Sequence, residues 1–487
     1  MKCRKNVKNL MPYEKSAFVQ AIIDLKKPGK RPSIIPAAQD DGATSRYDDY
    51  VWIHRAHCGA AFLPWHREFL KQFELDLQDV STNPRITLPY WDWTLHRSPG
   101  DPGWPFTIDL MGGLGTGSDN RVETGRFAEV GGEWLLNIHF DTDNTTYLRR
   151  RSDTSLISLT LLPDSNDADD CLGITVYDAF PWNNVCSPTS AQLQASFRKF
   201  LESVLHNIVH PIVGDLDFSS DPPDPIGSMS TMTSPNDPTF WLHHSNIDRL
   251  WAIWQQKYTS PITDYLPPTG TTSFHDINDN MSLLTASNFT WPVASRPIDV
   301  LDHRALGYWY DTDLPIVSFL SPSVNFGNIP VNSNTSKPVQ FAIRTCQSVG
   351  FRITSISGTN FSEPPSQGTV IVNHSDTIDP VTGNIYIQFH SVGPEFVLQS
   401  GSATVEAFIN DADGYFASNV NDVYIVGSWN VNLMATPVPE KIMLKVEMAE
   451  PHEHMKLFPV FIKEGENILK IDPSKLKGYK KGTLPRN

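Results

Sequence analysis

The rest of this 487-residue chain is arranged around the stretch Ser234-Pro-Asn-Asp-Pro-Thr-Phe-Trp-Leu-His-His-Ser-Asn-Ile-Asp-Arg-Leu-Trp251. Asp237 followed by Pro238 is typical of a helix N-cap with proline in the first turn. The residues that follow keep helical spacing, which places His244 in line with Trp251 on one side of the predicted helix. An imidazole in line with an apolar stripe points into a core, where it needs a hydrogen-bond partner or a metal ion.

A second predicted helix, over residues 197–210, offers two more imidazoles. His206 and His210 are four residues apart and therefore share a helical face. Two imidazoles at this spacing chelate one cation, and His244 completes a set of three. The spacing alone is a weak signal, since a pair of exposed surface histidines also fits it.

A third stretch, residues 47–69, holds His54, His57 and His66. Pro64 is typical of a helix start, and the helix that follows places His66 in line with apolar residues that face a core. Two groups of three histidines, each on helices with apolar faces, predict two metal ions held inside a helical bundle.

These stretches resemble a known family. The motifs HCGAAFLPWHREFL, LPYWDW, LHNIVH and SPNDPTFWLHHSNIDRLW resemble the copper-site motifs of tyrosinases, catechol oxidases and molluscan-type haemocyanins. Tyr308-Trp-Tyr310 is similar to the paired-tyrosine marker that closes the catalytic domain in that family. The resemblance runs from about residue 5 to about residue 313, and it implies a dinuclear type-3 copper centre.

The resemblance also implies the ligands and the reaction. Two copper ions, with O2 as co-substrate, would be bound by His54, His57, His66, His206, His210 and His244. The implied function is a phenol oxidase that hydroxylates monophenols to o-diphenols and oxidises o-diphenols to o-quinones. Two alternatives stay open: a catechol or o-aminophenol oxidase without hydroxylation, and a haemocyanin-like oxygen carrier. A single unit without tandem repeats disfavours the carrier.

Two further residues match the part of the family site that accepts the phenol proton. Asn207 matches directly, whereas Glu202 matches only if this chain has lost about one helical turn between the glutamate and His206. A solvated helix position explains Glu202 equally well. The resemblance assigns the ligand of the histidine pair to His244, which leaves His243 behind it or turned away.

The motif region departs from the family in two places. His54 and His57 are three residues apart, whereas a longer loop usually separates these ligands in the family. Many members carry a cysteine two residues before the second histidine, joined to it by a thioether. Arg55 occupies that position here, and Cys58 follows His57, so no such crosslink is expected.

Asp248 and the cysteines carry weaker expectations. The Asp248 carboxylate is a candidate to accept a ligand N–H and fix its tautomer, with an ion pair to Arg249 or a neighbour as the alternative. The five cysteines are Cys3, Cys58, Cys171, Cys186 and Cys346. An odd number without a CxxC pair favours free, buried thiols, although Cys171 and Cys186 are close enough to bridge in an oxidising compartment.

Composition excludes several classes of partner. The net charge of −15 disfavours binding to nucleic acid or to anionic lipid. No apolar run is long enough to predict a membrane span. The N-terminus lacks the apolar segment of a secretory signal, so no signal peptide is evident, and the expected location is cytoplasmic or unknown. The oligomeric state stays open.

The pattern of residues changes after Tyr310. Period-two alternation at residues 339–344, 385–390 and 442–448 predicts antiparallel strands. We therefore expect a mainly α catalytic domain at 1–313, a helical bundle holding a dicopper centre. An all-β sandwich-like domain at 314–450 and a tail at 451–487 follow it.

Loops are expected to shape access to the site. Residues 98–170, rich in Gly, Asp, Asn and Ser, predict long surface loops. Thr231 and Met232 are candidates for gating the second metal. An aromatic residue of the second domain, Tyr415 or Phe416, is a candidate to cover the entrance.

Overall fold

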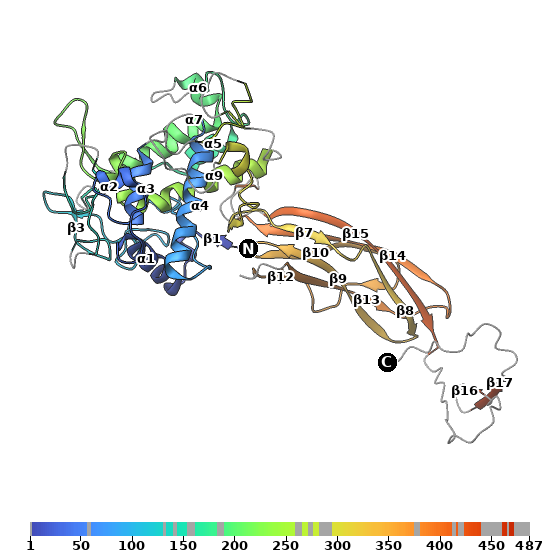
Figure 1. The fold of residues 1–487 in the computed structure, drawn as a ribbon. Coiled ribbons are helices and arrows are strands. Elements are labelled where there is room, and N and C mark those ends of the chain that lie inside the picture. Colours follow the sequence, from blue (N-terminus) through green and yellow to red (C-terminus); the bar gives the residue numbers. More distant parts are fainter. Residues whose placement is uncertain are drawn as a thin grey trace.

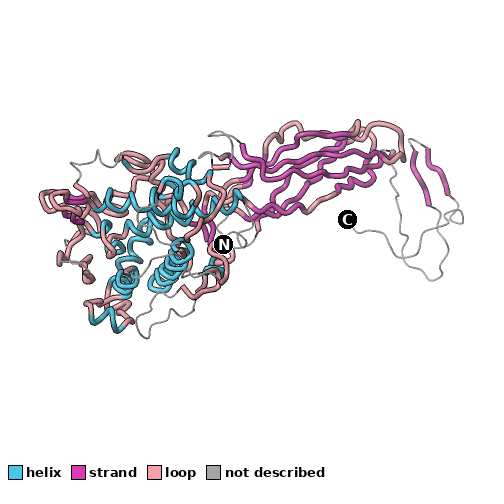
Figure 2. The backbone as a smooth tube through the Cα atoms, turned by 90° about the horizontal axis from the view of Figure 1, so that it is seen from above, coloured by secondary structure: helices cyan, strands magenta, loops and turns pink. Residues whose placement is uncertain are grey.

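The computed structural model shows a helical body joined to an elongated β-rich region, and the N-terminus lies where the two meet (Figure 1). Figure 2 shows the same division from above, with the helices at one end. The predicted order, a helical region followed by a β-rich one, is confirmed. The structure describes residues 2–55, 60–129, 133–139, 144–152, 161–182, 189–258, 265–270, 276–281, 295–374, 380–411, 415–416, 423–439, 460–464 and 467–471.

The helical body consists of helices separated by long loops. Their bounds are α1 (Pro12–Lys26), α2 (Pro36–Asp40), α3 (Arg46–His54), α4 (Phe62–Ser81), α5 (Ser165–Gly173), α6 (Ser190–Gln194), α7 (Phe197–Phe200), η3 (Leu201–His206), α8 (Asn207–Gly214) and α9 (Thr239–Tyr258). Helix α3 ends at His54. Among the helices of the described residues, none combines the length and apolar character needed to cross a bilayer.

Local sequence explains where two of these helices begin. The Ser45 hydroxyl accepts the backbone N–H of Asp48, and the Asp48 carboxylate accepts the N–H of Ser45 in return, which caps α3. Asp237 Oδ1 accepts the N–H of Thr239 at 2.9 Å at the start of α9. Both caps satisfy N–H groups that a helix leaves without partners in its first turn.

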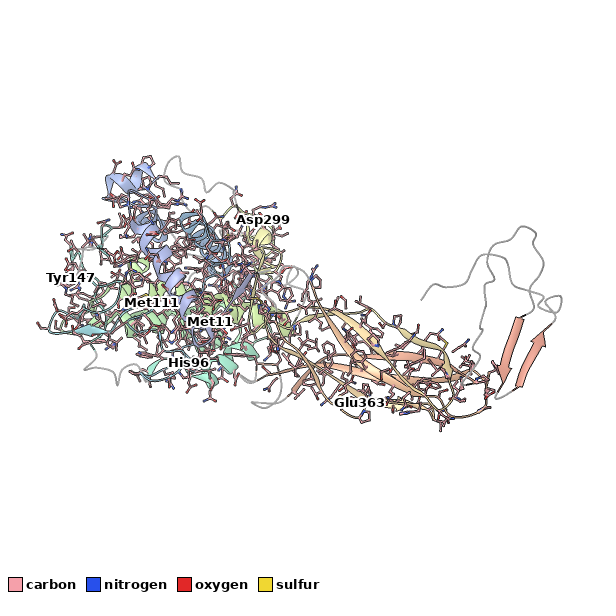
Figure 3. All side chains as sticks on the ribbon, turned by 90° about the horizontal axis from the view of Figure 1, so that it is seen from below. Met11, His96, Met111, Tyr147, Asp299 and Glu363 are labelled. Carbon is pink, nitrogen blue, oxygen red and sulfur yellow. A yellow bond between two sulfur atoms is a disulfide. The ribbon has the colours of Figure 1, made fainter. Side chains whose placement is uncertain are left out.

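The expectation of surface loops at residues 98–170 is wrong in part. The described residues there are mostly loops, with one short pair of strands, β2 (Gly115–Thr116) and β3 (Arg121–Val122). They nevertheless bury Trp104, Met111 and Trp134 in the core of the helical body. These apolar residues occur singly among polar ones, so no period marks them for burial. Figure 3 labels Met111 on this body.

The β-rich region contains, among its described residues, a five-stranded sheet of order β12-β10-β14-β15-β8 and a four-stranded sheet of order β11-β13-β9-β7. Neighbouring strands are antiparallel except β15 and β8, which pair in parallel. The bounds are β7 (Ile316–Phe319), β8 (Ser323–Pro330), β9 (Asn334–Arg344), β10 (Val349–Ser357), β11 (Phe361–Ser362), β12 (Val370–Val372), β13 (Val381–His390), β14 (Gln399–Asn410) and β15 (Val423–Val438). A separate pair, β16 (Val460–Glu464) and β17 (Asn467–Ile471), follows.

Alternating side chains from both sheets form one core. Phe341 on β9 and Ile387 on β13 belong to it, and so do Phe351 on β10 and Leu433 on β15. The strands predicted at 339–344 and 385–390 are confirmed within β9 and β13. The strand predicted at 442–448 lies outside the described residues.

The N-terminal strand connects the two regions. Strand β1 (Lys2–Arg4) pairs in parallel with β6 (Tyr308–Tyr310), and Cys3 forms a disulfide with Cys346, with Cα atoms 5.8 Å apart. The expectation of free thiols is therefore wrong for this pair. Sequence cannot anticipate it, because only folding brings two residues that are 343 positions apart into contact. Cys171 is free and buried, as expected, whereas Cys58 and Cys186 lie outside the described residues.

Tyr415 makes a second contact between the regions. Its hydroxyl donates to the Asp92 carboxylate at 3.0 Å, and Arg249 Nη2 donates to that hydroxyl at 3.1 Å. The ring of Phe416 packs against Tyr424 within the β-rich region. A cover over the metal entrance by either aromatic residue stays a prediction.

Candidate metal centre

Six described histidines converge in the core of the helical body. They are His54 at the end of α3, His66 on α4, His206 at the end of η3, His210 on α8, and His243 and His244 on α9. Two groups have ligand nitrogens within 4.8 Å of one another: His54, His66 and His244, and His206, His210, His243 and His244. His244 belongs to both groups, so they are adjacent. His57 lies outside the described residues.

In the first group, backbone carbonyls fix the imidazole tautomers. Nδ1 of His54 lies 2.9 Å from the carbonyl oxygen of Met232, and Nδ1 of His66 lies 2.8 Å from that of Phe62. A carbonyl oxygen only accepts, so each Nδ1 must carry the hydrogen. Each Nε2 then keeps its lone pair, which is the arrangement typical of histidines that bind a metal.

Two histidines of the second group, His206 and His210, are oriented in the same way. Nδ1 of His210 lies 2.7 Å from the carbonyl oxygen of Met229, and Nδ1 of His206 lies 2.8 Å from Oδ1 of Asn207. Both acceptors are oxygens, so both Nε2 atoms again carry lone pairs. Asn207 thus orients His206 directly.

The Nε2 atoms of His206, His210 and His244 face one another. Nε2 of His206 lies 3.0 Å from Nε2 of His210 and 3.2 Å from Nε2 of His244. Imidazole nitrogens bound tetrahedrally to one ion at about 2.0–2.1 Å lie about 3.3 Å apart. Two lone pairs at this distance repel unless a cation lies between them. The donor set therefore fits copper, for which imidazole is a suitable ligand.

The structure also separates the two adjacent histidines of α9. The indole N–H of Trp93 donates to Nδ1 of His243 at 3.0 Å. An indole nitrogen can only donate, so Nδ1 of His243 is the acceptor and its Nε2 carries the hydrogen. His243 therefore offers no lone pair to a metal in this arrangement, whereas Nε2 of His244 faces His206. The geometry favours His244 as the ligand.

Burial keeps the α9 histidines neutral. Burial, followed by the neighbouring imidazoles of His66 and His206, lowers the pKa of His244 well below its usual value. Burial and the imidazoles of His210 and His206 lower the pKa of His243 in the same way. A neutral imidazole retains a lone pair at pH 7, which metal binding requires.

Two phenylalanine rings pack against the histidines. The ring centroid of Phe62 lies 4.7 Å from that of His66 and 4.8 Å from that of His206. The centroid of Phe240 lies 4.1 Å from that of His244 and 4.8 Å from that of His54. These rings restrict the rotation of the imidazoles and exclude water from beside them.

A π-helical turn carries part of the second group. The segment η3 (Leu201–His206) is π-helical and lies between α7 and α8, where the sequence predicts one regular helix. Such turns occur frequently at functional sites, because the wider turn redirects side chains. His206 and His210 still share one face, as predicted.

Glu202 lies in the same π-helical turn. Its Oε2 accepts from Arg198 Nη1 at 2.6 Å, and Arg198 Nε also donates to Asp178 at 2.9 Å. Burial raises the pKa of Glu202, an effect that the Arg198 charge opposes. The structure therefore places this carboxylate in an ion pair, and its role as a proton acceptor stays a prediction.

Asp248 forms an ion pair with neighbouring arginines, which is the alternative expected from the sequence, but Arg249 is not one of them. Arg67 Nε donates to Asp248 Oδ1 at 2.6 Å, and the hydroxyls of Tyr308 and Tyr310 donate to Oδ2 at 2.7 and 2.6 Å. The carboxylate thus binds the paired tyrosines and Arg67, and neither Arg249 nor any histidine within the described ranges is its partner. The expectation that Asp248 accepts from a ligand histidine is therefore not met in the described part of the chain, where its partners come from segments distant in sequence.

Arg4 also donates to Asp248, whereas Arg249 pairs with Asp92. Arg4 Nη1 donates to Asp248 Oδ2 at 3.3 Å. Arg249 Nη2 donates to the Asp92 carboxylate at 2.9 Å. The buried carboxylates of Asp248 and Asp92 are therefore neutralised by separate arginines.

The loop before α9 contributes more than the sequence indicates. The backbone carbonyls of Met229 and Met232 anchor His210 and His54, one in each group. Sequence reasoning proposed Met232 for gating and missed Met229, because a backbone carbonyl leaves no signal in the residue type. The side chain of Met232 is 41% exposed, so gating stays a prediction that the geometry permits.

The sequence of this chain is similar to sequences of known proteins. The profile described as the common central domain of tyrosinase matches residues 44–257. The chain is 36% identical over 330 residues to a tyrosinase of Streptomyces glaucescens, and the match covers 64% of this chain and 100% of that protein. It is 34% identical over 322 residues to grixazone synthase of Streptomyces griseus, covering 63% of this chain and 98% of that protein.

A solved structure of recombinant mushroom tyrosinase aligns with 89% of this chain and 98% of its own, at 14% identity and a TM-score of 0.42. The sequence match to the Streptomyces glaucescens tyrosinase covers the full length of that protein. The predicted family membership is thereby confirmed. This chain belongs to the tyrosinase family of dinuclear type-3 copper proteins.

Proposed function

We propose that this protein is a copper-dependent phenol oxidase that uses O2 to hydroxylate monophenols to o-diphenols and to oxidise o-diphenols to o-quinones. The observation that carries the proposal is the convergence of the Nε2 atoms of His206, His210 and His244 beside the ligand nitrogens of His54 and His66. Membership of the tyrosinase family supports the same activity.

We propose His54, His57 and His66 as ligands of one copper ion, and His206, His210 and His244 as ligands of the other. When bound, the copper pair supplies the electrons that reduce O2. The chain contributes orientation: carbonyl oxygens hold Nδ1 of His54, His66 and His210, and Asn207 holds that of His206. A neutral, fixed imidazole set lets both ions keep open positions for O2 and substrate.

Substrate would approach from the side on which the site is least covered. Asn207 and Ile208 are exposed on α8, and the Met232 side chain is exposed on the loop before α9. A phenol has a pKa near 10, so hydroxylation needs an acceptor for its proton. Glu202, whose pKa burial raises, is the proposed acceptor.

We further propose the domain division predicted from sequence: 1–313 catalytic, 314–450 β-sandwich-like, and 451–487 a tail. The shared core of the two sheets supports the sandwich, and the Tyr415–Asp92 contact supports a second domain held on the catalytic one. Such a domain limits access to the copper pair if its loops extend over the entrance.

Copper analysis combined with O2 uptake tests the function. The protein is reconstituted with copper, and O2 uptake is measured with tyrosine and with a catechol, before and after limited proteolysis near residue 314. We expect two copper ions per chain and uptake with both substrates. His206→Ala is expected to lose copper and both activities.

Other outcomes would contradict the proposal in distinct ways. Uptake with the catechol alone would identify a catechol or o-aminophenol oxidase. Reversible O2 binding without turnover of either substrate, also after proteolysis, would identify an oxygen carrier. One copper ion or fewer per chain after reconstitution would contradict a dinuclear site.

A further inference from the structure

An imidazole lies beside the disulfide that joins the two regions. Nε2 of His374 lies 3.5 Å from Sγ of Cys3, and Nδ1 of His374 lies 2.7 Å from the carbonyl oxygen of Thr345. The carbonyl only accepts, so Nδ1 carries the hydrogen and Nε2 presents a lone pair toward the sulfur. A disulfide needs no imidazole for its stability, so this orientation points to a second role for the cluster.

The distance between Cys3 and His374 fits a metal ion, whereas the sulfur atoms of Cys3 and Cys346, which are bonded to each other in the disulfide, must separate on reduction before all three residues bind one ion. Their ligand atoms lie within 4.8 Å of one another. A tetrahedral ion with metal–sulfur bonds of about 2.3 Å and metal–nitrogen bonds of about 2.0–2.1 Å holds these ligands about 3.5 Å apart. The distance between Cys3 Sγ and His374 Nε2 has this value. The carbonyl of Thr345 fixes the imidazole in the way that is typical of metal-binding histidines.

We propose that Cys3, Cys346 and His374 form a binding site for one soft cation, copper(I), when the disulfide is reduced. Two thiolates and one imidazole are a donor set that selects copper(I) over harder ions. Both cysteines are buried, and Trp309 packs against them, so the bound ion is shielded from water.

Loading of this site requires two steps. A dithiol reductant transfers two electrons and two protons to the disulfide, which breaks the S–S bond, leaves two thiols and closes the dithiol to its own disulfide. Copper(I) then displaces the two thiol protons, which pass to solvent, and binds the thiolates and Nε2 of His374. The copper ion is not oxidised or reduced in either step.

The site would keep the two regions linked under reducing conditions. Cys3 lies on β1, which pairs with β6, whereas Cys346 and His374 belong to the β-rich region (Figure 1). An oxidising environment closes this link as a disulfide, and a compartment that keeps thiols reduced opens it. A bound ion would replace the covalent bond at the same position.

Copper(I) counting tests the proposal on the full chain. Oxidised protein and protein reduced with a dithiol, then desalted without oxygen, are each incubated with a cuprous acetonitrile complex and a competing chelator. We expect the reduced protein to retain one more copper ion than the oxidised protein. X-ray absorption is expected to show sulfur and nitrogen ligands on the additional ion. The comparison is a difference, so it does not depend on the proposed copper pair.

Three variants separate a metal site from a simple disulfide. His374→Ala leaves both cysteines able to form the disulfide, but it is expected to weaken binding of the additional ion by at least about tenfold. Cys346→Ser is expected to abolish that binding. Cys171→Ser, which removes a buried thiol outside the cluster, is expected to change nothing.

Two results would overturn the proposal. One is equal copper retention by the oxidised and reduced proteins. The other is equal retention by reduced wild type and reduced His374→Ala, which would show that the cysteines act only as a disulfide. Thermal unfolding of oxidised His374→Ala checks that the variant is folded, and its intact mass checks that the disulfide has formed.

Discussion

The hydroxyl of Tyr415 donates a hydrogen bond to the Asp92 carboxylate at 3.0 Å, across 323 positions of sequence. Asp92 also accepts from Arg249 on α9 and from the hydroxyl of Thr94. The next residue, Trp93, donates to His243 and so lies between this contact and the histidines. The β-rich region is thereby joined to the segment that positions the second metal group.

Replacement of Tyr415 by phenylalanine tests this contact. Tyr415→Phe leaves Asp92 and Arg249 without one buried partner, so we expect the free energy of unfolding to fall by about 1–3 kcal/mol. Tyr386, whose side chain is 42% exposed, provides the control variant Tyr386→Phe. Urea unfolding of both variants measures the difference, and equal losses would contradict the assigned contact.

The pKa of Asp92 predicts how the contact between the β-rich region and the helical body responds to acid. Burial alone would raise the pKa of Asp92, but Arg249, Thr94 and Tyr415 together lower it below its ordinary value of 3.8. A depressed carboxyl pKa contributes stability that is present above the ordinary pKa and is lost as the pH falls through the folded-state pKa. We expect this part of the stability to be constant near neutral pH and to disappear in strong acid. Unfolding followed against pH should show a weaker acid-dependent loss in Asp92→Asn, and an unchanged loss would exclude this carboxyl as its source.

Sequence periodicity and motifs predict much of this molecule. Helical spacing predicts the shared face of His206 and His210, and period-two alternation predicts β9 and β13. These features depend on neighbours within a few residues. Local patterns are therefore sufficient to find the histidine-bearing elements.

Features that depend on distant segments could not be predicted in this way. The Cys3–Cys346 disulfide needs the pairing of β1 with β6, and the carbonyl of Met229 reaches His210 only through the path of a loop. The partners of Asp248 come from both ends of the catalytic region. Backbone acceptors and long-range ion pairs leave no local pattern, so only the folded chain reveals them.

Asn207 provides a test of how the second metal group is oriented. Its Oδ1 accepts from Nδ1 of His206 at 2.8 Å, and its side chain is exposed, so Asn207→Leu should fold normally. We expect copper affinity of the second site to fall roughly 10–100-fold, the usual cost of losing the partner of a metal ligand. Asn207→Asp keeps an oxygen acceptor and should restore most of the affinity, with Ile208→Ala as the control. Excess copper should recover activity in Asn207→Leu if the residue only orients His206, whereas lost tyrosine hydroxylation at full copper loading would show a direct role in the reaction.

Asp248 on α9 is the central acceptor of a cluster of buried charges. Its carboxylate accepts from Arg67, Tyr308 and Tyr310, and it is buried. Asp248→Asn removes the countercharge of buried arginines, so we expect the free energy of unfolding to fall by about 3–5 kcal/mol. Asp299 forms an ion pair with Arg296 on the surface, is labelled in Figure 3, and gives the control Asp299→Asn, for which we expect a loss of about 1 kcal/mol or less. Chemical denaturation measures both variants. A similar small loss for both would mean that the buried cluster reorganises around the neutral amide, and would contradict the countercharge role of Asp248.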